Sequence, residues 1–389
     1  MNRRICFVGT EITPSEGSTF VGGHVNTVVS LCKGLADLGW EVHIVTTPSR
    51  FLRNPEFSFP WAKFHLVYPF GRYNSLGYDF DYLIKALRTV KVLSAKEHIQ
   101  LVHGHSGYFG PSIIPALVRR SLGVPALFSL YCPASLLPRK LPLDSFGINT
   151  LANGLDKVIA VTANVKESLT KCGVSAEKIE VLYSCFDEKA FSSFASKKGK
   201  VSQGSKVRKV LFVGNADKTK GLDIFLEAAK SILRTNPDVK FVVTLHEPDE
   251  RLQSVRVVAS RLLGSSVEVL GVVHDMAQLV SGVDVVVAPF RSTEGISDIP
   301  IIVLEAMALG KPVVASNLEG VREAIQHGKN GIIVDLGVDE LANAIKSLLD
   351  NPTLSEQIGR QAILDAKKFS YSEISKQLSN LYLRVMEAA

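Results

Sequence analysis

Cysteine is scarce in this 389-residue chain and follows no binding pattern. The five cysteines, Cys6, Cys32, Cys132, Cys172 and Cys185, are odd in number and widely separated, with no Cys-x-x-Cys pair. Such spacing indicates neither a disulfide framework nor a zinc site. It is typical of a reducing compartment, so we expect a cytoplasmic protein.

Long apolar runs are also lacking. No stretch approaches the roughly 20 apolar residues that span a bilayer. Arg3 and Arg4 precede an apolar run, but Ile5–Gly9 is too short for the hydrophobic region of a signal peptide, and Glu11 follows at once. A soluble chain of this length with 46% apolar residues is large enough for two domains with separate cores.

Lysine and arginine do not cluster into a stripe, and no nucleic-acid-binding module is visible, so we expect no nucleic-acid partner. The charge is nevertheless uneven. Residues 1–190 hold 20 basic against 15 acidic residues, whereas the remainder holds 24 against 23. A basic first half is suited to an acidic partner or to peripheral association with the inner membrane surface, and a merely solvated basic surface is the alternative.

Alternating strands and helices predict a doubly wound parallel sheet in the first half. The expected strands are 5–9, 41–47, 101–103, 126–130, 157–161 and 179–183, and the expected helices are 22–38, 111–122 and 163–171. Gly22 and Gly23 lie in a loop where the backbone approaches a ligand or simply turns tightly. His105 is expected just past a strand end, either exchanging a proton near neutral pH or satisfied by local backbone.

Aromatic residues crowd together between positions 51 and 82. They are Phe51, Phe57, Phe59, Trp61, Phe64, Tyr68, Phe70, Tyr73, Tyr78, Phe80 and Tyr82, with the basic residues Arg50, Arg53, Lys63 and Arg72 beside and among them. Alternation at Phe64, Leu66 and Tyr68 favours a strand, and hence core packing for most of these rings. The remainder would form an acceptor pocket or a membrane-facing loop.

A change of composition divides the chain. Residues 192–209 are mostly Ser, Lys, Gly and Gln, as expected of a linker. Residues 1–191 then form the first domain and 210–370 the second. In the second domain the expected strands are 210–214, 240–244, 267–270, 283–290, 312–315 and 331–334, with a helix at 221–233. From Val338 onward the pattern is helical, with breaks at Pro352 and Ser370.

The segment Asp298–Ser316 carries the clearest functional signal. Pro300 is expected at the first helical position, an apolar run extends to Ala308, and Gly310 stands at the expected C-cap. Glu305 is the one ionisable residue of this helix. A buried carboxylate needs donors, which a nearby Lys or Arg or the hydroxyls of a ribose would supply. The preceding strand places the 291–299 loop at the ligand edge of the sheet, where an anion would meet the helix N-terminus.

Four groups of residues resemble retaining glycosyltransferases of family four. They are Gly22-Gly23-His24-Val25 with Gly39-Trp40-Glu41-Val42, Phe212-Val213-Gly214 with Lys220-Gly221, the run from Leu304 to Val314, and Gly328-Lys329-Asn330-Gly331. The resemblance covers nearly the whole chain. It implies an α/β GT-B fold in which two Rossmann-like domains face each other across a cleft, with the last helix, about 371–389, joined to the first domain. It also implies retaining, metal-independent transfer of a hexose-type sugar from a nucleotide-diphosphate donor, UDP- or GDP-linked, to a glycan, a glycolipid or a small polar acceptor.

The same resemblance implies roles for individual residues. Glu305 would hold the ribose hydroxyls, Lys220 would neutralise the departing diphosphate, and Gly22 and Gly23 would offer it backbone amides. With His105, Lys220 and Glu305 are the catalytic candidates. The further donor-side candidates are Gly214, Asn215, Lys218, Glu294, Ser297, Asp298, Ile301 and Ile302, and the acceptor-side candidates are His24, Tyr131 and Arg139. No Asp-x-Asp element with matching ligands is found, so no metal cofactor is expected.

The chain departs from the family pattern at three positions. Asn215 stands where the family has arginine, Ser297 where it has its first glutamate, and Tyr131 where it has histidine. Lys218 or Arg291 is a candidate replacement for the arginine, and Asp298 or Glu294 for the glutamate. The alternative function is therefore a catalytically silent GT-B protein that binds a nucleotide sugar or glycan as a regulatory subunit. A nucleotide-sugar epimerase would need converging acidic and histidine residues that the sequence does not identify.

Overall fold

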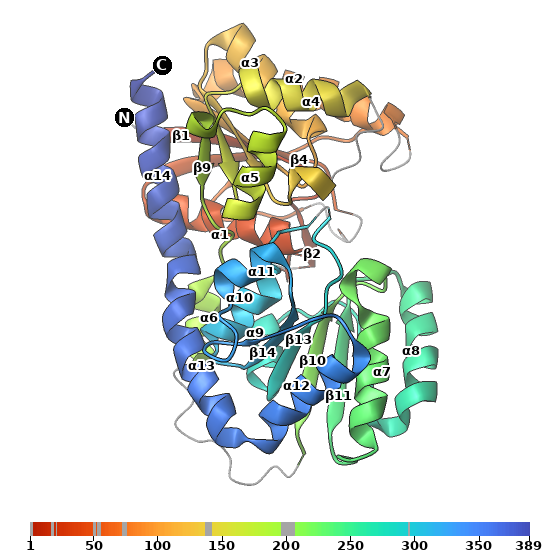
Figure 1. The fold of residues 1–389 in the computed structure, drawn as a ribbon. Coiled ribbons are helices and arrows are strands. Elements are labelled where there is room, and N and C mark those ends of the chain that lie inside the picture. Colours follow the sequence, from red (N-terminus) through yellow and green to blue (C-terminus); the bar gives the residue numbers. More distant parts are fainter. Residues whose placement is uncertain are drawn as a thin grey trace. The chain divides into compact units, whose positions relative to one another are not determined.

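A computed structural model describes residues 3–16, 19–20, 22–49, 52, 56–71, 76–136, 142–195, 207–294 and 296–389 (Figure 1). Its contacts divide the chain into two compact units. Unit 1 contains 1–185, 294–298 and 371–389, and unit 2 contains 186–293 and 299–370. Residues 196–206 of the expected linker lie outside the described residues, while residues 192–195 end a helix of unit 2, α6 (Glu188–Ala195).

Unit 1 is built on a seven-stranded parallel sheet. Its spatial order is β5 (Lys63–Leu66), β4 (Trp40–Thr46), β1 (Arg3–Val8), β6 (Leu101–Ser106), β7 (Ala126–Leu130), β8 (Lys157–Ala160) and β9 (Ile179–Val181). The helices are α1 (Gly23–Asp37), α2 (Leu76–Glu97), α3 (Ile113–Leu122), α4 (Pro142–Asn153), α5 (Ala163–Lys171) and α14 (Tyr371–Glu387). A short hairpin, β2 (Pro14–Glu16) with β3 (Thr19–Phe20), follows β1.

Strand alternation distributes the core of unit 1 over two faces. Ile5 and Phe7 of β1 pack in the cluster that includes α1 and α14, whereas Cys6 and Val8 pack in the cluster with α2 and α3. All four side chains are fully buried. A strand apolar on both faces is characteristic of a parallel sheet covered by helices on each side.

Unit 2 repeats this architecture with six parallel strands. Their order is β12 (Val267–Leu270), β11 (Lys240–Leu245), β10 (Lys209–Gly214), β13 (Val285–Ala288), β14 (Val313–Ser316) and β15 (Ile332–Val334). Besides α6, the helices are α7 (Leu222–Leu233), α8 (Asp249–Leu263), α9 (Met276–Ser281), α10 (Ile301–Ala308), α11 (Glu319–Ala324), α12 (Val338–Asp350) and α13 (Pro352–Ala366).

Several elements differ from the sequence prediction, among them β6, α10 and α2. β6 continues to Ser106, so His105 lies within the strand and not beyond its end, because the small Gly104 is accommodated between Phe128 and Pro115. Pro300 is the N-cap of α10 and precedes its first helical residue. The 22-residue helix α2 was not predicted, because the aromatic residues around its start suggested only strand and loop.

The aromatic stretch separates into a packed part and an exposed part. Phe57, Phe59, Trp61 and Phe64 are half-buried and make ring contacts with one another and with Phe20. The prediction of core packing is confirmed for Trp61 and Phe64, which lie against the core of unit 1. Tyr68, Phe70 and Phe80 are instead 59%, 76% and 47% exposed. Phe51 and Tyr73 lie outside the described residues. Among the helices of the described part, none is long and apolar enough to cross a membrane.

Candidate functional site

The predicted site residues gather at the carboxyl edges of the two sheets. Each sheet contains a pair of neighbouring strands from which the strand order runs in opposite directions, β1 and β6 in unit 1, and β10 and β13 in unit 2. Ligands of open α/β sheets bind outside the carboxyl ends of such strand pairs. The loops after β10 and β13 carry most of the donor-side candidates, and β6 carries His105.

Lys220 is a buried cation in the loop after β10. Its side chain is 7% exposed, and its Nζ lies 4.4 Å from the centre of the Phe290 ring. Burial lowers the pKa of Lys220 to about 8, although the nearby Asp217 carboxylate raises it. Within the described residues, the ammonium has no hydrogen-bond or ion-pair partner. A desolvated ammonium costs several kcal/mol, roughly, unless an anion compensates it, so this position favours an anionic ligand.

The turn that holds Lys220 is fixed by Asp217 and Gly221. Asp217 caps a single 3₁₀ turn, Lys218–Lys220, by accepting from the Thr219 amide at 3.0 Å. Gly221 ends this turn with φ 71°, and a Cβ on it would lie 2.0 Å from the Pro289 carbonyl oxygen. Only glycine permits this approach, which sets Lys220 beside the chain leaving β13.

Glu305 is a buried carboxylate on α10. It is 8% exposed in a helix whose other residues from Ile301 to Met307 are also buried. Burial, together with a smaller effect of the Asp187 carboxylate, raises the pKa of Glu305 to about 7. The alternative prediction, a structural pairing with Lys or Arg, finds no such partner for Glu305 among the described residues. Lys220 and Glu305 are thus both buried without an ion-pair partner among the described residues.

The remaining unit 2 candidates lie at the end of β10, in the loop that follows it and at the start of α10. Gly214 ends β10, and a Cβ on it would be 3.3 Å from Cβ of Lys220. Asn215 is half-buried next to it and Lys218 is exposed. Ile301 and Ile302 form the buried start of α10. Arg291, considered as a substitute cation, forms a two-pronged ion pair with Asp223 at 2.7 Å, so its charge is already compensated.

Glu294, Ser297 and Asp298 belong to unit 1. Asp298 is 1% exposed, and its carboxylate accepts hydrogen bonds from Thr162 Oγ1 at 2.7 Å and Asn164 Nδ2 at 3.0 Å. Its amide donates to the Tyr131 carbonyl at 2.8 Å. Ser297 Oγ lies 2.7 Å from Ser184 Oγ, while Glu294 is exposed. The segment is therefore anchored to unit 1 by side chains that sequence reasoning did not identify, Thr162, Asn164 and Ser184.

His105 and Tyr131 form a buried pair in unit 1. His105 Nδ1 lies 3.0 Å from the Tyr131 hydroxyl, and its ring stacks on Phe7 at 4.7 Å with a 9° angle between planes. Its Nε2 is buried and has no partner in the described part of the chain. Burial holds the pKa of His105 well below its usual value, with His103 and His24 adding, so the ring is neutral at pH 7. It can offer a hydrogen bond to a ligand, but not a positive charge.

His24 and the glycine pair lie nearby on α1. Gly22, at φ 111°, is the N-cap and Gly23 the first residue of the helix. The His24 ring centre is 6.0 Å from that of Tyr131, and burial lowers the pKa of His24 to about 4. Arg139 lies outside the described residues.

His103 is a buried residue that the sequence did not single out. Its Nδ1 lies 2.5 Å from the Tyr382 hydroxyl and its Nε2 2.9 Å from Ser129 Oγ. Both ring nitrogens are therefore satisfied, which marks His103 as structural.

The Asp79-Phe80-Asp81 triplet has the spacing of a metal-binding Asp-x-Asp element. It lies on α2, where Asp81 pairs with Lys85 at 2.7 Å and accepts from the Phe70 amide at 2.7 Å. The Asp81 carboxylate is therefore already held by two donors of its own unit.

Comparison with known proteins follows the division into two halves. Residues 21–189 match the family model described as Glycosyltransferase Family 4, and residues 207–351 match the one described as Glycosyl transferases group 1. The chain is 28% identical over 302 residues to the alpha-D-kanosaminyltransferase of Streptomyces kanamyceticus, covering 73% of this chain and 77% of that protein.

Solved structures share the fold over the full length. Sucrose-phosphate synthase from Thermosynechococcus elongatus superposes with a TM-score of 0.80 at 20% identity, covering all of both chains. HepE from Anabaena, solved with UDP and glucose, gives a TM-score of 0.74 at 19% identity, covering 97% of this chain and 98% of that one. With family models on both halves and this two-sheet architecture, the chain belongs to the family-four glycosyltransferases of the GT-B fold.

Proposed function

We propose that this glycosyltransferase transfers a hexose-type sugar, with retention, from a UDP- or GDP-linked donor to a hydroxyl acceptor and needs no divalent metal for the transfer. The observation that carries the proposal is the pair of buried, uncompensated charges in unit 2, Lys220 and Glu305. A nucleoside diphosphate has the matching chemistry, since its phosphates are anionic and its ribose carries two hydroxyl donors.

Lys220 has the central catalytic role in this proposal. When the bond from the sugar to the diphosphate breaks, negative charge builds on the leaving oxygen. A preorganised ammonium in a water-poor site stabilises that charge without reorganisation. With Asn215 uncharged and Arg291 paired to Asp223, Lys220 carries this charge alone among the buried residues after β10 and β13 in the described structure.

Glu305 and α10 would hold the nucleotide. The carboxylate accepts from the ribose hydroxyls, while the N-terminal amides of α10, at Ile301 and Ile302, face anionic groups favourably. His105, neutral and with a free buried Nε2, would contribute a hydrogen bond to the sugar or acceptor and not a charge. The proposed contact of Gly22 and Gly23 amides with the diphosphate rests on the family resemblance.

We further propose that the acceptor is presented at an anionic membrane surface. An apolar patch on unit 1 consists of Tyr68, Phe70, Phe80 and Ile84, whose side chains are 47–76% exposed. Lys85 Nζ stands 3.7 Å above the Phe70 ring, and it also donates to the Tyr68 carbonyl. Because Lys85 is also paired with Asp81 at 2.7 Å, the exposed rings carry the membrane argument, since such side chains suit the headgroup region. The basic excess of residues 1–190 favours an anionic surface.

Cosedimentation tests this part. Protein should pellet with vesicles containing anionic lipid, less with neutral vesicles, and should be released by salt because exposed charges are screened beyond roughly 10 Å at 0.1 M. Replacing Phe70 and Phe80 by serine should abolish pelleting. Leu364→Ser, at a 57% exposed residue of α13, is the matched control that should leave it unchanged. Equal behaviour of the two variants would refute the membrane role of the patch.

A catalytically silent relative is the second candidate. It is favoured by the engagement of Ser297 and Asp298 with Ser184, Thr162 and Asn164, because side chains expected near the donor sugar already have partners. Donor hydrolysis separates the two. Slow release of sugar from UDP- or GDP-sugars supports the enzyme, while binding without any release supports the silent protein.

A further inference from the structure

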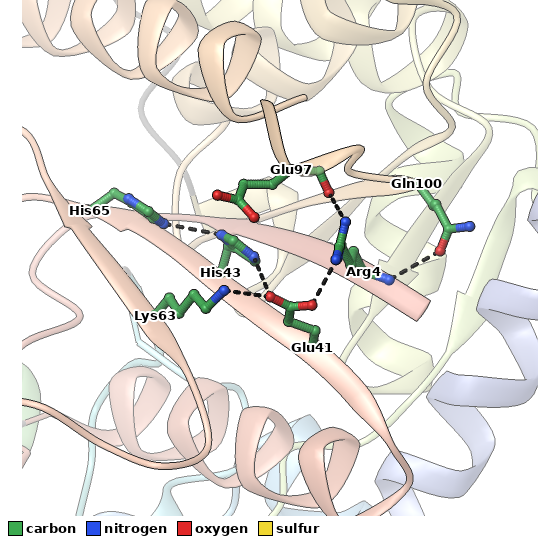
Figure 2. A network of polar contacts seen from close by, with 7 residues as sticks. All are labelled: Arg4, Glu41, His43, Lys63, His65, Glu97 and Gln100. Carbon is green, nitrogen blue, oxygen red and sulfur yellow. Dashed lines mark hydrogen bonds and ion pairs between the residues drawn. The ribbon is translucent and has the colours of Figure 1, made fainter. Parts of the chain in front are cut away.

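A second group of ionisable residues lies in unit 1, away from the site edge. Glu41 and His43 are on β4, His65 is on β5, and Glu97 ends α2 (Figure 2). Glu41 pairs in register with Arg4 near the start of β1, so this group stands toward the amino ends of the strands. The site residues of unit 1 stand at the carboxyl ends.

Three of these side chains converge. One atom each of Glu41, His43 and Glu97 lies within 4.8 Å of the other two, and Figure 2 shows the Glu97 carboxylate directed toward the His43 ring. His43 is fully buried, and its Nε2 has no hydrogen-bond partner among the described residues, although Glu41 Oε1 is 3.5 Å away. This buried ring nitrogen lies beside the Glu41 carboxylate without a hydrogen bond to it, and it is therefore available as a ligand atom.

His65 sets the state of that nitrogen. His43 Nδ1 lies 3.1 Å from His65 Nε2, and the two rings stack with 3° between their planes. With the His43 proton on Nδ1 and donated to His65, the lone pair of Nε2 points at the carboxylates. A partner on the second ring nitrogen is the usual way in which metal-binding histidines are oriented.

We propose that Glu41, His43 and Glu97 bind a divalent transition metal, with zinc as the reference ion, and that His65 orients His43. One imidazole and two carboxylates form an accepted zinc ligand set, with water completing the coordination. Zinc ligands stand at about 2.0–2.2 Å from the ion, and Glu97, partly exposed at the end of α2, would turn its carboxylate toward it. The ion would join β4 to the end of α2 and thus stabilise unit 1.

Two cations, Arg4 and Lys63, already contact the Glu41 carboxylate and would compete with a metal ion for its oxygens. Arg4 Nε lies 2.8 Å from Oε2, and Arg4 also donates to the Glu97 carbonyl at 2.7 Å. Lys63 Nζ lies 2.6 Å from Oε1 on a side chain that is 58% exposed. Arg4 can stay on Oε2, while Lys63 would leave Oε1 to the metal and turn into solvent. Removing Lys63 should therefore strengthen metal binding, which an ion-pair network without a metal role does not predict.

Zinc chloride titration of the full chain, by calorimetry and by thermal shift, tests the proposal. We expect one saturable zinc site. Its affinity should fall tenfold or more in Glu97→Gln and about 10–100-fold in His65→Ala, which removes the orienting residue. In Lys63→Ala the zinc affinity should rise severalfold. Glu97 is at a helix end, so its amide variant should fold. Glu177→Gln, elsewhere on unit 1, is the control that should bind like the original.

The proposal is overturned if the unchanged protein and Lys63→Ala show no saturable zinc binding, or if Glu97→Gln binds zinc as the original does. Cobalt gives a second readout, since its visible absorption should change when His43→Gln removes the nitrogen ligand. Donor hydrolysis with and without a chelator keeps this test separate from the proposed function, because the proposed metal ligands belong to unit 1 whereas Lys220 and Glu305 belong to unit 2, so the two proposals can fail independently.

Discussion

Replacing Glu305 by glutamine removes its charge and keeps its size. The pKa of Glu305 is about 7 without ligand, because burial disfavours the carboxylate and Asp187 adds repulsion. Ribose hydroxyls donate hydrogen bonds, and a carboxylate accepts them more strongly than a carboxylic acid. Donor binding therefore selects the ionised form and should release a proton when it occurs below pH 7.

The magnitude follows from that pKa. With one pH unit changing the ratio of ionised to protonated carboxyl tenfold, about a tenth of Glu305 is ionised at pH 6 and about nine tenths at pH 8. Donor affinity should rise roughly tenfold across this interval. Hydrogen bonds to a charged group contribute about 1.5–3 kcal/mol, so Glu305→Gln should lose that much affinity at pH 8 and lose the pH dependence as well.

Isothermal calorimetry at pH 6, 7 and 8 is the appropriate assay. The ligand should be the UDP-, GDP- or ADP-sugar that stabilises the protein most in a thermal-shift screen, because its esterified diphosphate has no proton to lose in this range. Buffers of different ionisation enthalpy report the released proton directly. A folded Glu305→Gln variant with unchanged affinity, or a flat pH profile in the original protein, would refute the reasoning.

The remaining predictions concern the same unit. Lys220→Ala should lower turnover roughly a hundredfold to a thousandfold, as for loss of a preorganised oxyanion donor, with little change in donor affinity. If Lys218→Ala causes this loss instead, the exposed neighbour is the catalytic cation. Gly221→Ala should destabilise unit 2 by more than the roughly 1–2 kcal/mol that a left-handed conformation costs a non-glycine residue, because its Cβ would lie 2.0 Å from the Pro289 oxygen. Gly173→Ala is the control, at φ 91° with nothing within 4 Å, and in urea unfolding it should show the backbone cost alone. Because the folded pKa of Glu305 is raised from 4.5 to about 7, its contribution to the free energy of unfolding is present below pH 4.5 and lost by about pH 7. Between these values the free energy of unfolding of the ligand-free protein should fall by about 1.4 kcal/mol per pH unit, and Glu305→Gln should remove this fall.

Periodicity was sufficient to predict most of the fold. In unit 2 the apolar runs and their flanking glycines place β10, β11 and β12 within a residue or two of their observed bounds. Such runs are informative because a strand buried on both faces must be apolar throughout. Helix α2 was missed because exposed apolar residues, Phe80, Ile84 and Val92, interrupt the expected polar outer face.

The site could be predicted only where a residue stands out from its local sequence. Glu305 does so, as a single charge in an apolar helix, and Lys220 does so beside the obligatory Gly221. The anchoring of Asp298 by Thr162 and Asn164 could not be foreseen, because these residues are more than 130 positions away and have no distinctive pattern of their own. The sequence also did not predict that Glu41, His43 and Glu97 come together, because Glu97 is distant in the chain from the other two.

The stereochemistry of transfer in the presence of a chelator tests the central claim most directly. An α-linked nucleotide-sugar donor and a hydroxyl acceptor are incubated with the protein and excess EDTA, and the anomeric configuration of the product is read by proton NMR. The account predicts an α-linked product formed at an undiminished rate, and loss of that product in Lys220→Ala. A β-linked product would contradict it, and so would transfer that stops with EDTA and returns with added metal in Glu97→Gln, the variant with the weakened unit 1 metal site.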